Sequence, residues 1–148
     1  MTTYTQIIYQ IVFGTWRRRK VLTNPNRKEL FKYMWGVLAE KKCHPYIING
    51  IEDHVHFVTH IHPSIALASL IKDIKLASTY HIKHNNLFEN FNGWQEGYGA
   101  FTYTIKEKER LVNYVKNQEE HHKKQRYKDE YSDLLQEHGI EFDERYFI

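Results

Sequence analysis

Apolar residues recur along the chain with two spacings that alternate. Residues 4–16 are rich in Ile, Val, Tyr and Phe and place Ile7, Tyr9, Ile11 and Phe13 on one face, which predicts a long first strand. A helix follows, because the next apolar residues repeat at helical spacing up to about Lys42. The Asn24-Pro25 pair before it is typical of an N-cap and a first helical turn.

The middle of the chain continues this alternation. Residues 46–49 and 54–61 are short β-branched segments around a turn-like connection, so they predict a hairpin. A broad apolar stripe then predicts a second helix that is capped by Ser64 and ends before Asn85. Residues 93–104, which contain several glycines, predict a fourth strand.

The last third of the chain has helical patterns only. Thr104 and Glu107 have the spacing of a capping box, which predicts a third helix over about residues 105–123. A further helix is expected over about residues 128–138, and residues 140–148 have no clear assignment.

This order of elements predicts an α+β protein with a ferredoxin-like βαββαβ core, an antiparallel sheet and additional C-terminal helices. We expect residues 1–148 to form a single domain, with a core over about residues 4–123 and a helical extension over about 124–148.

Composition narrows the class of protein. The 148 residues are 41% hydrophobic, which suffices for one core. The single cysteine, Cys43, excludes a disulfide framework and a cysteine-rich zinc module. No apolar run reaches the length of a membrane span, and the N-terminus lacks the pattern of a signal peptide. We therefore expect a cytoplasmic protein with no membrane partner, whose formal net charge of +3 permits a polyanionic one.

Two histidines stand out in the predicted strand over residues 54–61. His54 and His56 share one face because strand side chains alternate, while Val55 between them points to the other face. Two imidazoles on a rigid strand form half of a metal site. They are also compatible with two partly exposed histidines, since the chain has ten histidines and repeats the spacing at His60 and His62.

A second pair of polar residues lies on the predicted third helix. Tyr114 and Gln118 are four residues apart and so share one helical face, close to an apolar stripe. Tyr114 can be a core aromatic residue, but a buried Gln118 amide needs a partner. A divalent metal bound by His54, His56 and Gln118 would supply that partner, beside a tyrosine hydroxyl able to attack phosphorus.

Three segments in this order resemble the single-tyrosine HUH transposases of the IS200/IS605 type and their domesticated relatives, the REP-associated tyrosine transposases. The segments read Asp53-His54-Val55-His56, Gly93-Trp94-Gln95-Glu96-Gly97-Tyr98-Gly99-Ala100-Phe101 and Tyr114-Val115-Lys116-Asn117-Gln118. With the basic residues 17–20 after the first strand, the resemblance spans about residues 4–123.

The resemblance implies a transposase and single-stranded DNA endonuclease with a ferredoxin-like core. Such proteins act as homodimers on single-stranded DNA that forms imperfect hairpins, and they need Mg²⁺ or Mn²⁺ but no nucleotide. It implies that His54, His56 and Gln118 are metal ligands and that Tyr114 is the nucleophile. Tyr114 would cleave DNA through a 5′-phosphotyrosine intermediate and later rejoin it. In this family the tyrosine helix can complete the site of the partner subunit.

Basic residues suggest where DNA binds. Arg17, Arg18, Arg19 and Lys20 form a cluster after the first strand, and Lys72 and Lys75 project from the second helix. We expect these six residues to contact the phosphate backbone, which would associate the protein with the nucleoid.

The histidine pair His121 and His122, beyond Gln118, is interpreted as exposed helix residues.

Three alternatives stay open. The chain can be a domesticated REP-associated relative acting on chromosomal palindromes, which changes the biology more than the chemistry. It can be a non-catalytic module that binds single-stranded or hairpin DNA. It can also be a hydrolase in which His54 and His56 hold a metal-bound hydroxide, in which case no DNA becomes linked to the protein.

Overall fold

The computed structural model describes residues 2–143 and 145 and contains a four-stranded antiparallel sheet with strand order β2-β3-β1-β4. The strands are β1 (Ile8–Gly14), β2 (Cys43–Ile51), β3 (His54–Ile61) and β4 (Gly99–Tyr103). The helices are α1 (Asn26–Glu40), α2 (Leu67–His84), α3 (Lys108–Lys116), α4 (Gln118–His121) and α5 (Tyr127–Glu137), with 3₁₀ turns η1 (Trp16–Arg18) and η2 (Ile105–Glu107). This arrangement confirms the predicted α+β, ferredoxin-like fold with additional C-terminal helices.

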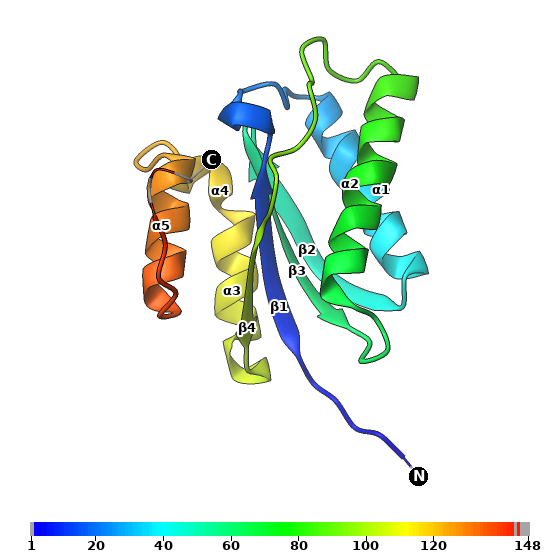
Figure 1. Ribbon diagram of the computed structural model, residues 1–148, viewed down its shortest axis with the longest axis vertical. Helices are drawn as coiled ribbons and strands as arrows, with labels where there is room; N and C mark the ends of the chain where they lie inside the picture. Colours follow the sequence, from blue (N-terminus) through cyan, green and yellow to red (C-terminus); the bar gives the residue numbers. More distant parts are fainter. Residues whose placement is uncertain (1, 144, 146–148) are drawn as a thin grey trace.

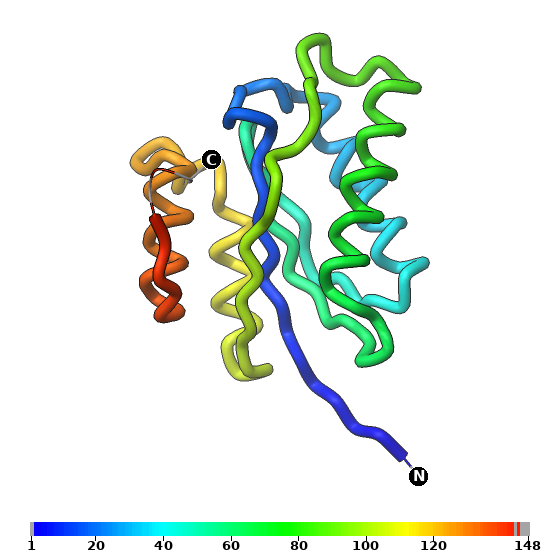
Figure 2. Tube along the Cα trace, in the orientation of Figure 1, coloured from blue at the N-terminus to red at the C-terminus, as the bar shows by residue number. Residues whose placement is uncertain are grey.

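Helices cover both faces of the sheet. Helices α1 and α2 pack on one face, and α3 and α5 lie over the other, as Figure 1 shows. The two central strands, β1 and β3, are therefore buried on both sides, so that the polar side chains of His54, His56 and Thr59 on β3 are buried as well. In the tube view of Figure 2 the N-terminal residues extend away from this body before β1 begins.

Several predicted element boundaries are wrong by a few residues. The first strand begins at Ile8 rather than at residue 4, the second extends over Cys43–Ile51, and the fourth begins only at Gly99. Neither predicted helix cap is made: α1 begins after Pro25 and α2 after Ala66, in both cases without a side-chain cap hydrogen bond. Caps are local signals, and here packing against the sheet decides where the helices begin.

The predicted third helix is interrupted, and this difference bears on the site. The expected Thr104–Glu107 capping box is present, but it starts the 3₁₀ turn η2, and α3 follows it. Asn117, with φ −96° and ψ 24°, separates α3 from the single-turn helix α4. The break lies directly before Gln118, which therefore begins α4 instead of continuing α3.

The last predicted helix is present as α5, and Gly139 follows it with a φ of +68°, as expected for a helix stop. Of the unassigned segment 140–148, residues 144 and 146–148 lie outside the described residues. Within the described part of the chain, no helix has both the length and the apolar composition that crossing a membrane requires.

Candidate active site

His54 and His56 lie on the central strand β3 and are completely buried. Both face the side of the sheet that α3 and α5 cover, whereas Val55 and Phe57 belong to the core beneath α1 and α2. The predicted alternation is therefore confirmed, and the alternative of two partly exposed histidines is wrong. Burying two imidazoles requires polar partners on the same face.

Gln118 supplies one of these partners. Its side chain is fully buried at the start of α4, and its Oε1 lies 3.0 Å from His54 Nε2. Tyr114, one turn earlier on α3, packs its ring edge-on to His56 with 6.0 Å between the ring centroids. The structure thus brings all four predicted residues, His54, His56, Gln118 and Tyr114, to one place within a single chain.

Asp53 and Tyr127 hold the His54 ring in place. The Asp53 Oδ1 accepts a hydrogen bond of 2.7 Å from His54 Nδ1, and the Tyr127 ring stacks on the imidazole at 4.2 Å. Burial lowers the pKa of His54, but hydrogen bonds with Asp53 and Glu130 outweigh it and raise that pKa to about 9. With Nδ1 occupied by Asp53, Nε2 is the atom that faces the site.

His56 is positioned from the neighbouring strand. Gln10 on β1 lies beside it, with 3.2 Å between Gln10 Nε2 and His56 Nδ1, and the Gln10 Oε1 accepts a 2.7 Å hydrogen bond from the Tyr103 hydroxyl. Burial lowers the pKa of His56, which favours a neutral imidazole. A neutral imidazole is the form that binds a metal.

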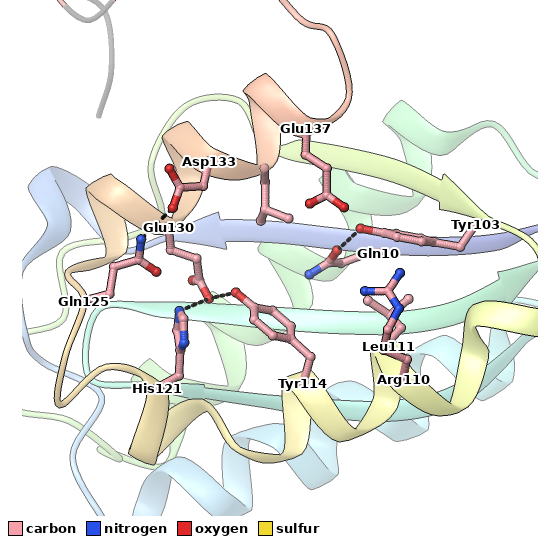
Figure 3. Close-up of a pocket in the computed structure, with 11 residues that line it drawn as sticks. Gln10, Tyr103, Arg110, Leu111, Tyr114, His121, Gln125, Glu130, Asp133 and Glu137 are labelled. Carbon is pink, nitrogen blue, oxygen red and sulfur yellow. Dashed lines mark hydrogen bonds and ion pairs between the residues drawn. The ribbon is translucent and has the colours of Figure 1, made fainter.

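Glu130 on α5 is the residue that sequence reasoning missed. Its carboxylate is only 2% exposed, and its Oε1 lies 3.2 Å from His54 Nε2 and 3.0 Å from His56 Nε2. Its other oxygen, Oε2, accepts hydrogen bonds from the Tyr114 hydroxyl and from Gln118 Nε2. Figure 3 shows Tyr114 pointing at Glu130 across the gap between α3 and α5.

A signal for Glu130 exists in the sequence. The buried residues of α5 repeat at helical spacing and are Tyr127, Glu130, Tyr131, Leu134 and Leu135. A carboxylate on an otherwise apolar stripe faces the core and must meet cations or hydrogen-bond donors there. The pattern would identify a buried acid, although not the histidines it meets.

The interpretation of His121 and His122 as exposed residues is wrong. His122 follows α4 directly, its side chain is only 3% exposed, and its Nε2 lies 3.0 Å from Glu130 Oε1. The His121 side chain is 32% exposed, with its Nε2 3.5 Å from Glu130 Oε2. His121 is the last residue of α4 and His122 is its C-cap, and both rings lie next to Glu130 on α5.

Burial and neighbouring charges shift the pKa values of the two acidic groups of the site: they act together on Tyr114 and in opposite directions on Glu130. Burial of Tyr114 raises the pKa of its hydroxyl, and the neighbouring Glu130 carboxylate raises it further. Burial also raises the pKa of Glu130, but the surrounding histidines outweigh this effect and keep it far below its usual value. Glu130 is therefore an ionised acceptor and Tyr114 a neutral donor.

The donor set fits a divalent cation. Ligand atoms from His54, His56, His122 and Glu130 all lie within 4.8 Å of one another, with the Gln118 amide oxygen beside them. Imidazole, carboxylate and amide groups are accepted by Mn²⁺ and other first-row divalent metals, and the oxygen donors also by Mg²⁺.

A cavity of about 200 Å³ adjoins this cluster between α3 and α5. Tyr114 and Glu130 form part of its wall, together with Tyr103 and Arg110 (Figure 3). The cavity therefore gives access to the Tyr114 hydroxyl from the side of the molecule where α3 and α5 meet.

The predicted DNA-binding cluster at residues 17–20 lies next to the site. Arg17, Arg18 and Arg19 follow β1, and the Arg18 and Lys20 side chains line a cavity of about 260 Å³ that also borders on Asp53 and His122. The Arg18 Nη1 is buried without a hydrogen-bond partner in the described part of the chain.

The other two predicted DNA-binding residues, Lys72 and Lys75, lie on α2, on the opposite side of the sheet. Lys72 is exposed there. The Lys75 Nζ donates to the backbone carbonyl oxygens of Gln95 at 2.8 Å and Gly97 at 2.7 Å. Desolvation by burial lowers the pKa of this lysine.

Comparisons with known proteins bear on the family and on the fold. A family model described as "Transposase IS200 like" matches residues 3–118. The fold is similar to that of a transposase candidate from Deinococcus radiodurans R1, with a TM-score of 0.59, 19% identity, and coverage of 80% of this chain and 95% of that one. It is also similar to a REP-associated tyrosine transposase bound to a REP hairpin, with a TM-score of 0.56, 15% identity, and coverage of 82% and 74%. No curated protein shows significant sequence similarity to the chain.

Proposed function

The chain belongs to the family of IS200-like transposases, and on this premise we propose that it cleaves and rejoins hairpin-bearing single-stranded DNA through a tyrosine–DNA intermediate. The observation that carries the proposal is the convergence of the Tyr114 hydroxyl with His54, His56 and Gln118 in one buried site. A non-catalytic DNA-binding module, the alternative, does not require a tyrosine hydroxyl next to buried candidate metal ligands.

We assign the nucleophile to Tyr114. Its oxygen loses its proton and attacks the scissile phosphorus, the bond from phosphorus to the 3′ oxygen breaks, and that oxygen takes up a proton and leaves as a 3′-hydroxyl. The product is a 5′-phosphotyrosine whose bond replaces the phosphodiester, so a 3′-hydroxyl can reverse the step and rejoin DNA without a nucleotide. Glu130 Oε2 accepts the hydrogen bond of the Tyr114 hydroxyl and so fixes the direction of its oxygen.

His54, His56 and Gln118 would hold a divalent cation, Mg²⁺ or Mn²⁺. When bound, such a cation offsets negative charge on a phosphate oxygen. Asp53 orients His54 for this role by accepting from its Nδ1, and Gln10 contacts the opposite edge of the His56 ring. These outer residues explain why the two imidazoles remain in fixed positions on the strand.

The DNA is proposed to approach from the basic side of the site. Arg17, Arg18, Arg19 and Lys20 follow β1, and the Arg18 Nη1, which has no hydrogen-bond partner among the described residues, is suited to a phosphate. Lys72 and Lys75 would contact a part of the DNA that passes over α2. A hairpin substrate is supported by the similar fold of the transposase bound to a REP hairpin. Its source, a mobile element or chromosomal palindromes, decides between an active and a domesticated transposase.

The proposed function also implies an oligomeric state and a cellular location. A homodimer is expected from the family, although every residue assigned to the chemistry comes from one chain. Action on chromosomal or element DNA implies the cytoplasm and an association with the nucleoid.

The test is the formation of a covalent adduct. Purified protein with Mg²⁺ or Mn²⁺ and a pool of hairpin-bearing single-stranded oligonucleotides is expected to give a denaturation-resistant protein–DNA adduct. Tyr114→Phe should abolish the adduct, whereas Tyr80→Phe, which alters a 67% exposed tyrosine on α2, should leave it intact. Cleavage without an adduct would favour the metal-dependent hydrolase and overturn the proposal.

A further inference from the structure

The C-terminal segment contributes two side chains to the candidate metal site. His122, just after α4, and Glu130, on α5, are both nearly buried, and Glu130 Oε1 lies 3.0 Å from the Nε2 atoms of His56 and His122. Three imidazole nitrogens thus surround one carboxylate oxygen. Residues that only covered the site would be apolar, because burying a carboxylate and an imidazole is costly.

The ring orientation of His122 is also that of a ligand. Its Nδ1 lies 2.6 Å from the backbone carbonyl oxygen of Gln125, which can only accept, so the Nδ1 carries a hydrogen. His54 has the same arrangement, with its Nδ1 bonded to Asp53. In the neutral form, both rings therefore direct the lone pair of Nε2 towards Glu130. A divalent cation between these nitrogen lone pairs and the carboxylate oxygen would satisfy all of them at once, as in metal centres with outer hydrogen-bond acceptors.

The separations agree with this arrangement. Bonds of about 2.1 Å to a divalent cation place neighbouring ligand atoms about 3 Å apart when they are at right angles. The distances from Glu130 Oε1 to the three histidine nitrogens are 3.0, 3.0 and 3.2 Å.

We propose that His122 and Glu130 complete the ligand set that His54 and His56 begin, so that metal binding and the docking of α5 on the sheet are coupled. The inference rests on the proposed function in that it concerns the same metal. It adds that residues beyond the family match, which ends at residue 118, are part of the metal centre.

Glu130 also connects the metal ligands to the nucleophile. While Oε1 faces the histidines, Oε2 accepts hydrogen bonds from the Tyr114 hydroxyl and from Gln118. Docking of α5 therefore places the ligand and orients the tyrosine in one step. Towards Tyr114, Glu130 acts as a positioning residue.

The first experiment measures Mn²⁺ binding to the full chain, stripped with a chelator, by calorimetry and by the Mn²⁺ electron paramagnetic resonance signal. Glu130→Gln and His122→Gln are each expected to raise the dissociation constant at least about tenfold. Glu137→Gln removes a carboxylate from the same helix, and His62→Gln removes an exposed histidine. Both controls should bind Mn²⁺ like the parent.

The second experiment needs no variant and so does not depend on their folding. Hydrogen exchange of the parent is compared with and without Mn²⁺. Amides of α5 are expected to exchange at least about tenfold more slowly with the metal, while those of α1, on the opposite face of the sheet, should not change.

The outcomes separate this inference from the proposed function. The ligand assignment is overturned if Glu130→Gln binds Mn²⁺ as tightly as the parent, or if Mn²⁺ leaves the hydrogen-exchange rates of the α5 amides unchanged. Either result overturns it even when the adduct forms. A Glu130→Gln variant that binds Mn²⁺ normally and cleaves DNA faster would show instead that the carboxylate occupies the place of a substrate phosphate. Loss of Mn²⁺ affinity in both variants supports the ligand assignment, even if no adduct with Tyr114 is found.

Discussion

Tyr114 donates its hydroxyl hydrogen bond to Glu130, sixteen residues later in the same chain. The bond joins α3 to α5 and holds the candidate nucleophile against the histidine pair of β3. In this arrangement the candidate nucleophile and the candidate metal ligands belong to the same chain.

This arrangement predicts the result of mixing two inactive variants. Tyr114→Phe lacks the nucleophile and His56→Gln lacks a ligand, so in a mixed dimer neither chain has a complete site if the residues act within one chain. We expect no covalent DNA adduct from the two variants co-expressed with different tags and purified through both. The co-expressed pair Tyr80→Phe and His62→Gln is the control and should form the adduct. An adduct in the first mixture would mean that the tyrosine helix serves the partner subunit.

The fold was largely predictable because it depends on periodicity. Apolar residues at every second position identified the strands, and helical spacing identified the helices. Boundaries were less predictable, since the 93–104 segment approaches β1 at Trp94 through an isolated bridge with Thr15 but forms a strand only from Gly99. Pairing with β1, rather than the local sequence, determines where that strand begins.

The site was predictable only in part, for a related reason. His54, His56, Tyr114 and Gln118 lie in short motifs whose spacing carries their relationship. Glu130 is 74 residues from His56, and no local pattern connects the two. Their contact depends on the turn after α4 and on the packing of α5, which are properties of the tertiary structure.

Variants of Gln118 test how much its buried amide contributes to stability with and without a metal. Gln118→Ala removes a buried donor to Glu130 and the amide oxygen near His54, so we expect it to lower the free energy of unfolding by about 1–3 kcal/mol. Gln118→Glu places a second carboxylate beside Glu130 and should destabilise the metal-free protein at least as much. Mn²⁺ should recover more stability in the Glu variant than in the Ala variant. Thermal unfolding with and without Mn²⁺ measures both effects, with the exposed Gln136→Ala as the control; equal recovery would contradict the prediction.

Lys75 and Lys72 should differ although both are lysines of α2. Lys75 donates to two backbone carbonyl oxygens and lies 5.1 Å from the centre of the Phe13 ring. Because the side chain is partly exposed, we expect Lys75→Met to cost about 1–2 kcal/mol of unfolding free energy. Lys72→Met should stay within about 0.5 kcal/mol. Chemical denaturation compares the two variants, and equal stability would show that the Lys75 contacts contribute little.

Gly14, the last residue of β1, packs closely against the start of α5, and enlarging its side chain tests whether this contact holds α5 in place. A β-carbon at this position would lie 2.6 Å from Tyr127 Cε2 and 2.8 Å from Gln95 Oε1. The Gln95 Oε1 accepts hydrogen bonds from both the Gly14 amide and the Tyr127 hydroxyl. If Gly14 moved away from Tyr127, at least one of these two hydrogen bonds, which connect β1 to α5, would break. Gly14→Ala is therefore expected to destabilise the protein by about 1–3 kcal/mol.

The same variant should weaken Mn²⁺ binding, because Tyr127 stacks on His54 and begins the helix that carries Glu130. Gly36→Ala is the matched control: its β-carbon would meet nothing within 4 Å on the exposed side of α1, and alanine favours a helix by about 1 kcal/mol over glycine. Thermal unfolding and Mn²⁺ titration of both variants measure the two effects. If Gly14→Ala lost stability but bound Mn²⁺ as tightly as the parent, the position of α5 would not matter to the metal.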